Sequence, residues 1–178
     1  MTKQYTSLGL MSGTSGDGVD ASIIQSNGDD QYKVIEEQYF QYDNHIYQKI
    51  HSLKEKINNF QDLDKLDNEL NNLERIITLF HVDKIKKLRN ISDIEIIGFH
   101  GQTIYHNPSE KISKQLGNGK LLAQLTNKKI VYNFRQNDIL NGGEGAPLAP
   151  VFHQLLVAKT NLELPVCVLN IGGISNMT

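Results

Sequence analysis

A stretch of small and polar residues near the start of the chain has the composition of a phosphate-binding loop. It lies between apolar runs at 8–11 and 19–24 and consists of Ser12, Gly13, Thr14, Ser15, Gly16, Asp17 and Gly18. Glycine has no Cβ, so the backbone can approach a ligand closely and turn successive N–H groups toward one anion. The hydroxyl groups in the stretch add further donors. We therefore expect this loop to bind phosphate.

Two acidic residues at the end of the stretch, Asp17 and Asp20, indicate a metal ion. A carboxylate repels a phosphate unless a cation lies between them, and Mg²⁺ prefers carboxylate, water and phosphate oxygens. We expect Asp17 and Asp20 to hold Mg²⁺ beside the bound phosphates.

The stretch differs from the lysine-containing P-loop of many nucleotide-binding proteins. No Gly-Lys-Ser/Thr follows its glycines, and residues 19–24 alternate between apolar and polar or small side chains, as a strand does. Short turns rich in Gly, Ser and Asp are also common between strands. Spacing alone leaves two interpretations open, a phosphate-binding loop and an ordinary β-hairpin turn.

The overall composition is that of a globular protein without a basic surface. The chain has 178 residues, of which 39% are hydrophobic and 21% charged, and its formal net charge is −2. This length suits one domain, or one domain and part of another, and this charge argues against a nucleic-acid or anionic-membrane partner. The single cysteine, Cys167, excludes an internal disulfide framework. With no long apolar run either, we expect a cytoplasmic protein.

Hydrophobic periodicity predicts an alternation of strands and helices. After the glycine-rich stretch and its exit strand, further strands are expected over 32–42, 93–99, 129–134 and 165–171. Helices are expected over 45–60 and 63–80, and again from residues near 119 and 150. The strand 165–171 runs into two glycines and a further strand, which echoes residues 8–24 and indicates a duplicated fold of two domains.

Polar residues follow the ends of two of these strands, where α/β proteins commonly bind ligands. His100 and Gln102 follow the strand 93–99, and Arg135 and Asp138 follow the strand 129–134. These strand ends are therefore the second candidate region for a site.

Five segments together resemble the anhydro-N-acetylmuramic acid kinase family, bacterial enzymes of cell-wall recycling. They occur in the family's order and read MSGTSGDGVDA (11–21), IGFHGQTIYHNP (97–108), QLGNGKLLA (115–123), VYNFRQNDILNGGEGAPLAPVFH (131–153) and LNIGGISNMT (169–178). The resemblance implies an α/β fold of the actin-like ATPase (RNase H-like) class, with a mixed sheet flanked by helices. It further implies a first domain over 1–164 and the opening hairpin of a second over 165–178, in a truncated portion of a longer protein.

The same resemblance implies an activity and its small-molecule partners. Members of the family use ATP and Mg²⁺ to cleave and phosphorylate 1,6-anhydro-N-acetylmuramic acid, which gives N-acetylmuramic acid 6-phosphate. A sugar is therefore the expected partner, with no nucleic acid and no membrane, and a homodimer is left open. The family's ATP-binding segment corresponds to Gly13, Thr14, Ser15, Gly16, Asp17, Gly18, Val19 and Asp20.

Sugar-binding residues are implied in the same way. The acceptor carries a lactyl carboxylate, and the planar guanidinium of Arg135 suits such a group. The sugar hydroxyl and acetamido groups are expected to bond to His100, Gln102, Gln115, Asn118 and Asp138. Two alternatives stay open, a salt bridge between Arg135 and a neighbouring acid, and a His100 satisfied by loop backbone groups.

Two positions depart from the family's pattern. The family usually carries a larger apolar residue where Gly16 stands, and this change is expected to loosen the loop. It normally has aspartate where Asn133 stands, which puts in doubt any pairing of that residue with Arg135 or a metal.

The catalytic base is missing from these residues. In the family it is an aspartate of an Asp-Thr-Gly-Pro-type motif, expected beyond Thr178, so we expect this portion alone to be inactive. Two other classes remain open: a non-catalytic sugar- or nucleotide-binding module, and a hydrolase that uses Ser12 or Ser15 with His100.

Overall fold

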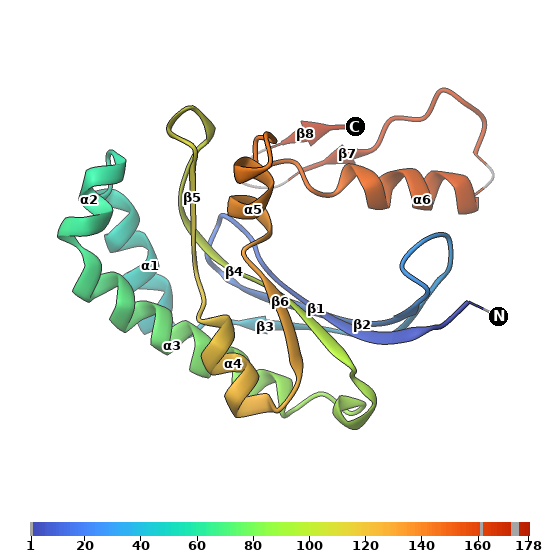
Figure 1. The fold of residues 1–178 in the computed structure, drawn as a ribbon, viewed down its shortest axis with the longest axis horizontal. Coiled ribbons are helices and arrows are strands. Elements are labelled where there is room, and N and C mark those ends of the chain that lie inside the picture. Colours follow the sequence, from blue (N-terminus) through green and yellow to red (C-terminus); the bar gives the residue numbers. More distant parts are fainter. Residues whose placement is uncertain (1, 161, 172–174) are drawn as a thin grey trace.

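A six-stranded mixed sheet forms the centre of the molecule in a computed structural model that describes residues 2–160, 162–171 and 175–178 (Figure 1). The strands of this sheet are β1 (Tyr5–Ser12), β2 (Gly18–Ser26), β3 (Tyr32–Gln41), β4 (Ile96–Asn107), β5 (Ile112–Leu116) and β6 (Lys129–Tyr132). Their order is β3-β2-β1-β4-β5, and β6 pairs with β4 on the same sheet. The expected α/β class with a mixed sheet is confirmed.

Strand β1 has an antiparallel neighbour on one side and a parallel neighbour on the other. It pairs antiparallel with β2, which pairs antiparallel with β3, and it pairs parallel with β4. β4 is also parallel to β6 and antiparallel to β5. Because Ser12 at the end of β1 pairs with Gln102 of β4, the turn after β1 lies beside the polar residues of β4.

In the described part of the chain, six α-helices connect and cover the strands. They are α1 (Asn44–Lys56), α2 (Phe60–Lys65), α3 (Asp67–Ile85), α4 (Gly119–Thr126), α5 (Phe134–Leu140) and α6 (Pro150–Thr160), with 3-10 turns at Ile91–Asp93 and Pro108–Glu110. Side-chain caps begin three of them: Asp43 accepts from the amide of Ile46, Asn59 forms a capping box with Asp62, and Asn118 accepts from the amide of Leu121. Such caps satisfy amides that the first helical turn leaves unpaired.

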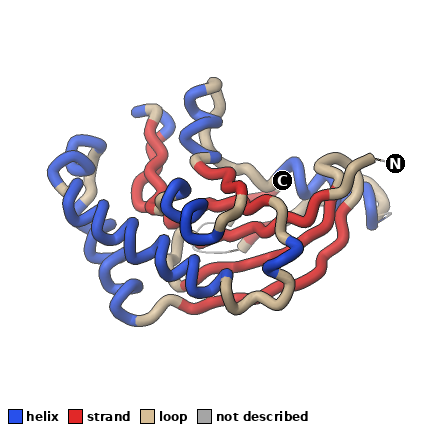
Figure 2. Tube along the Cα trace, turned by 60° about the horizontal axis from the view of Figure 1, so that its bottom comes forward, coloured by secondary structure: helices blue, strands red, loops and turns tan. Residues whose placement is uncertain are grey.

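The core lies between the sheet and helices α1, α3 and α4 (Figures 1 and 2). Helix α1 buries Ile46, Ile50 and Leu53, and α3 buries a longer stripe that includes Leu73 and Ile77. These apolar residues repeat at the three- and four-residue spacing of one helical face. They pack on strand residues such as Leu8, Ile23, Ile97 and Phe99, all almost fully buried. This packing fixes α1 next to the β1–β2 turn.

The structure differs from the expected elements in two places that affect the site. The helix expected over 63–80 is broken at Leu66, which has φ −100° and ψ 11° and separates α2 from α3. The strand expected to end at Phe99 continues to Asn107, because pairing with β5 extends it. Gly101 permits this continuation with a φ of +71°, a value that favours glycine. Residues 100–103 therefore lie in a strand and not in a loop.

The C-terminal elements form a separate layer. β7 (Leu169–Asn170) and β8 (Asn176–Met177) pair with each other in a two-stranded sheet, shorter than the strand expected over 165–171. The two glycines expected after that strand lie outside the described residues. In Figure 1, α6 and this pair lie above the main sheet, whereas α3 and α4 lie below it.

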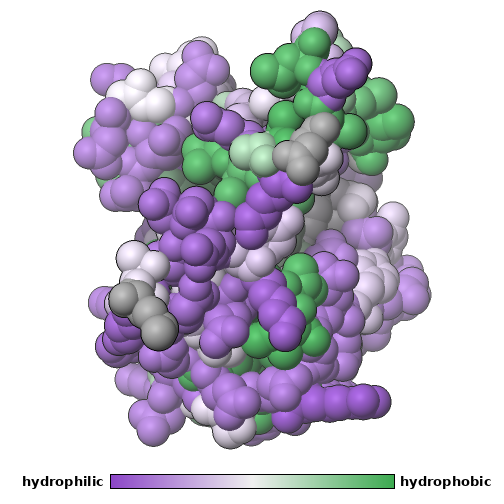
Figure 3. All heavy atoms as spheres, turned by 90° about the vertical axis from the view of Figure 1, so that its right-hand side faces the viewer, coloured by the Kyte–Doolittle hydropathy of each residue, from purple (hydrophilic) through white to green (hydrophobic). Residues whose placement is uncertain are grey.

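Large apolar side chains are exposed in this layer. No residue of α6 is buried, and Val151, Leu164 and Ile171 are each more than three-quarters exposed. Figure 3 shows apolar residues gathered on the upper part of the side where α6 lies. Among the described residues, no helix combines the length and apolar character that crossing a membrane requires.

Candidate functional site

The glycine-rich stretch forms the tight turn between β1 and β2. Its backbone closes on itself where the amide of Gly16 donates to the carbonyl of Gly13 at 3.1 Å. Gly16 has a φ of +68°, and a Cβ there would lie 3.0 Å from Cγ2 of Ile50 on α1. Gly16 therefore lets the turn pack closely against α1. The sequence predicts only that this glycine loosens the loop, and not this packing role.

Three consecutive carbonyl groups of this turn are each held by a side chain from elsewhere in the chain. The Gly13 carbonyl accepts from Nε2 of Gln102 at 2.9 Å, the Thr14 carbonyl accepts from Nζ of Lys54, and the Ser15 carbonyl accepts from Nε2 of His51 at 2.9 Å. Lys54 and His51 belong to α1, and Gln102 belongs to β4. The turn is therefore held from two sides by the packed fold.

This arrangement leaves two amides of the turn free to bind an anion. In a planar trans peptide the N–H points away from the C=O. The held carbonyls of Gly13 and Thr14 share their peptides with the amides of Thr14 and Ser15, so these amides point away from Gln102 and Lys54. Within the described ranges, neither amide has a hydrogen-bond acceptor. Adjacent backbone amides of this kind form anion-binding concavities.

Asp17 and Asp20 lie at the exit of the turn and influence each other. The Ser15 hydroxyl donates to Asp17 and holds the pKa of that carboxyl below its ordinary value. Burial and the nearby Asp17 carboxylate raise the pKa of Asp20. Two carboxylates that repel each other beside free amides fit a divalent cation shared with a phosphate. In the described part of the chain, no three His, Cys, Asp or Glu side chains gather into a metal-binding cluster.

Three polar residues, Ser12, Tyr42 and Gln102, lie next to the turn on its buried side. The Ser12 hydroxyl lies 2.9 Å from the hydroxyl of Tyr42, and Gln102 is fully buried. While Nε2 of Gln102 holds the Gly13 carbonyl, its Oε1 has no hydrogen-bond partner among the described residues. Gln102, expected to bind sugar, thus lies beneath the turn and supports its backbone.

Arg135 and His100, on neighbouring elements, form a second cluster. Nε of Arg135 donates to Nε2 of His100 at 2.8 Å, and Nη1 donates to the carbonyl of Gly145 at 2.7 Å. His100 is neutral, because burial, with a smaller effect of the Arg135 charge, lowers its pKa to about 4. Its Nδ1 therefore donates to the carbonyl of Gly101 at 2.7 Å. Both ring nitrogens of His100 are therefore occupied: Nδ1 fixes the ring to the backbone of Gly101, and Nε2 orients Arg135.

Arg135 carries a charge without a matching acid. Among the described residues it forms no salt bridge, so that alternative is not what the structure shows. Nη2 remains as a donor, and burial lowers the pKa of the guanidinium. A partly desolvated arginine with an unused donor edge is suited to a carboxylate or phosphate.

Asp138 and Asn133 shape the backbone around Arg135. Asp138 accepts from the amide of Gly145 at 2.8 Å, and a Cβ on Gly143 would lie 2.1 Å from its Oδ2. Asn133 lies just before α5 with a φ of +61°, a conformation that asparagine tolerates better than most residues. Asp138 thus holds the loop whose Gly145 carbonyl receives Arg135.

Gln115 and Asn118 line a pocket of about 390 Å³ whose lining residues include Glu74, Lys114, Tyr132 and Gln136 but not Arg135. Nε2 of Gln115 donates to the Ser113 hydroxyl at 2.8 Å, and its buried Oε1 has no partner in the described part of the chain. The Oδ1 of Asn118 caps α4. The expected sugar-binding residues therefore divide between this pocket, the Arg135 cluster and the underside of the turn.

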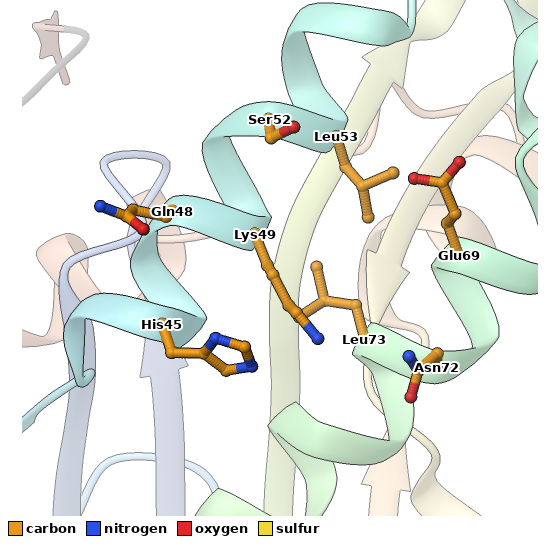
Figure 4. A pocket seen from close by; sticks show the side chains of 8 residues that line it. All are labelled: His45, Gln48, Lys49, Ser52, Leu53, Glu69, Asn72 and Leu73. Carbon is orange, nitrogen blue, oxygen red and sulfur yellow. The ribbon is translucent and has the colours of Figure 1, made fainter.

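A second pocket of about 410 Å³ lies between α1 and α3, on a side of α1 that does not hold the turn (Figure 4). His45, Lys49, Leu53, Glu69 and Asn72 are among the residues that line it. None of the expected site residues belongs to it.

The structure pairs neither candidate serine with His100. Ser12 bonds to Tyr42, Ser15 bonds to Asp17, and His100 bonds to Arg135 and Gly101. The geometry therefore lends no support to the hydrolase alternative in the described ranges.

Sequence reasoning missed Lys54 and His51. Their helix was predicted from its apolar residues, which include Ile50 and Leu53. Nothing in the sequence marks these two polar residues, because they reach the turn only through the packing of α1 against it.

Comparison with known proteins supports the resemblance. Residues 5–178 match the profile of the family described as anhydro-N-acetylmuramic acid kinase. The chain is similar to proteins of that name from Pelagibacter ubique, 59% identical, and Agrobacterium fabrum, 39% identical, with the whole chain aligned to 48% and 50% of these relatives. One from Gluconobacter oxydans is 41% identical, over 96% of this chain and 47% of the relative. The chain spans about half the length of these curated relatives, and it belongs to the anhydro-N-acetylmuramic acid kinase family.

Proposed function

We propose that the complete protein is an ATP-dependent kinase that converts 1,6-anhydro-N-acetylmuramic acid into N-acetylmuramic acid 6-phosphate. Membership in the family, and with it in the actin-like ATPase fold class, supports this assignment. The observation that carries it for this chain is the turn at 13–17, in which side chains hold the carbonyls of residues 13–15 while the amides of Thr14 and Ser15 have no acceptor among the described residues. The aspartate that acts as base is expected outside residues 1–178. We therefore assign binding and orientation to the residues described here, and no proton abstraction.

The turn is proposed to bind the ATP phosphates. The amides of Thr14 and Ser15 donate to phosphate oxygens, and the hydroxyl of Thr14 is available beside them. Asp17 and Asp20 are proposed to hold Mg²⁺, which when bound offsets negative charge on the phosphates. Gly18 and Val19 begin β2 and fix the exit of the turn. A held triphosphate needs these groups fixed in advance, because positioning is a large part of phosphoryl-transfer catalysis.

Arg135 is proposed to bind the lactyl carboxylate of the sugar. The supporting observation is a half-buried guanidinium that lacks an acid partner in the described ranges and is fixed by His100 and Gly145. His100 and Asp138 then act by positioning Arg135 and its loop. Gln115 and Asn118 are proposed to contact the sugar from the pocket of about 390 Å³ that both residues line.

The domain division is proposed at residue 165. The pair β7–β8 is a sheet of its own, separate from the six-stranded sheet, which supports its assignment to a second domain.

The assignment is tested by ATP turnover of the complete gene product with and without the anhydro sugar. We expect turnover only when the sugar is present, and slower turnover in Asp17→Asn, which removes a metal-facing charge. Asp29→Asn, an exposed acid in the β2–β3 turn, is the matched control and should behave like the unchanged protein. Equal ATP hydrolysis with and without sugar would refute the kinase assignment.

A further inference from the structure

Helix α1 has two sides with different surroundings. One side lines the pocket shared with α3, where the side chains of His45 and Lys49 lie (Figure 4). The other side faces the turn at 13–17 and includes Ile50, His51 and Lys54. These three residues are spaced at one, three and four positions, which places them on neighbouring rows of one helical face.

Each of these residues meets a different part of the turn. Lys54 holds the Thr14 carbonyl and His51 holds the Ser15 carbonyl. Ile50 packs against Gly16, where a Cβ would lie 3.0 Å from its Cγ2. His51 is itself stacked near Tyr47, with ring centroids 4.2 Å apart. Three successive residues of the turn are therefore set by one helix.

Lys54 brings a charge that the turn lacks. Residues 13–20 contain two acids and no lysine or arginine. Lys54 is half-buried, and within the described residues it forms no salt bridge with an acid. Burying a cation without a paired anion costs stability. A half-buried ammonium group beside a turn whose Thr14 and Ser15 amides lack acceptors in the described ranges is understandable if an anion binds there.

We propose that Lys54 is a positioning residue of the turn at 13–17. In the lysine-containing P-loop the positive charge comes from a lysine of the loop itself, whereas here it comes from Lys54 on α1. This inference rests on the proposed function, in which the turn binds the phosphates of ATP. Lys54 acts in two ways: it orients the Thr14–Ser15 peptide so that the Ser15 amide faces the ligand, and it raises the positive potential there. The ligand class is a nucleoside di- or triphosphate, and the nucleoside itself gains nothing from Lys54.

Calorimetric binding of MgATP and of adenosine to the complete gene product tests this inference. Lys54→Met keeps most of the aliphatic stem and removes the charge, Lys54→Arg keeps the charge, and Lys49→Met is the control on the other side of α1. We expect Lys54→Met to weaken MgATP binding about tenfold or more, the range of one charge-assisted hydrogen bond. Lys54→Arg should recover most of that loss, and Lys49→Met should leave MgATP binding unchanged. Adenosine binding should be equal in all variants.

Two outcomes would refute the role of Lys54, and a third would refute phosphate binding by the turn. If Lys54→Met binds MgATP as well as the unchanged protein, the role of Lys54 is refuted. If MgATP and adenosine weaken together and Lys54→Arg recovers neither, Lys54 only supports the fold, and the inference is again refuted. If the unchanged protein binds no MgATP, the phosphate-binding turn itself is refuted. Should Lys54→Met fail to fold, Lys54→Gln against Lys54→Arg makes the same comparison.

Discussion

Gly18 lies at the end of the turn at 13–17 and begins β2, and its replacement by alanine is the sharpest structural test of how that turn is packed. A Cβ at this position would lie 2.5 Å from Oη of Tyr39 and 2.6 Å from the carbonyl oxygen of Phe40. Tyr39 could rotate away, but the Phe40 carbonyl belongs to the backbone of β3, which pairs with β2 at this point. Gly18→Ala therefore has to move a strand.

Overpacking of this kind costs about 1–3 kcal/mol. With a urea m-value of about 2 kcal/mol per molar, the midpoint of unfolding should fall by roughly 1 M. The matched control is Gly9→Ala in β1, where the nearest atom to a new Cβ is the Ser22 carbonyl oxygen at an ordinary 3.9 Å. That control should keep or slightly raise the midpoint, because alanine is favoured over glycine in a strand.

The two variants should also separate in MgATP affinity. Tyr39 contributes a hydrogen bond that lowers the pKa of Asp17, so displacement of β3 disturbs the acid proposed to hold the metal. We expect weaker MgATP binding in Gly18→Ala and unchanged binding in Gly9→Ala. Equal urea midpoints for the two variants would refute the packing argument.

Two further predictions concern Arg135 and the buried histidine His81. Arg135→Lys removes the guanidinium group that bonds to His100 and Gly145, so the KM for the anhydro sugar should rise about 10- to 100-fold while the KM for ATP changes little. Arg89→Lys, at an exposed position, is the control. A parallel rise in both KM values would contradict the proposed contact between Arg135 and the sugar. Burial lowers the pKa of His81 to about 4. Between about pH 6.5 and 4, His81 is therefore protonated in the unfolded chain but neutral in the folded chain, so the free energy of unfolding falls as the pH falls through this window. By urea unfolding, His81 should account for about 3 kcal/mol of this loss, and His81→Phe should reduce the pH slope by that share. Part of the slope should remain, because burial also lowers the pKa of His100 to about 4. The exposed control His45→Gln should leave the slope as it is, and an unchanged pH slope in His81→Phe would contradict the argument.

The opening hairpin could be predicted well because its signals are local. Residues 19–24 alternate as a strand does, and glycines mark the turn, so β2 appears over Gly18–Ser26 as expected. Most of the helix predicted over 45–60 is present as α1 (Asn44–Lys56), because its apolar stripe is visible within the helix itself, but it ends four residues earlier than predicted.

Features that depend on distant partners could not be predicted. The strand that continues from Phe99 to Asn107 does so because β5 pairs with it, and no local pattern shows that pairing. The same holds for the Lys54 contact with Thr14, which joins residues 40 positions apart. The three regions over which the expected sugar-binding residues are divided also follow from packing and not from spacing.

The central claim is that the amides of Thr14 and Ser15 bind the phosphates of ATP. A crystal structure of the complete gene product with Mg²⁺ and a non-hydrolysable ATP analogue tests it most directly. We expect phosphate oxygens about 3 Å from both amide nitrogens, with the carbonyls of residues 13–15 still held by Gln102, Lys54 and His51. A triphosphate bound elsewhere, with both amides open to solvent, would contradict it.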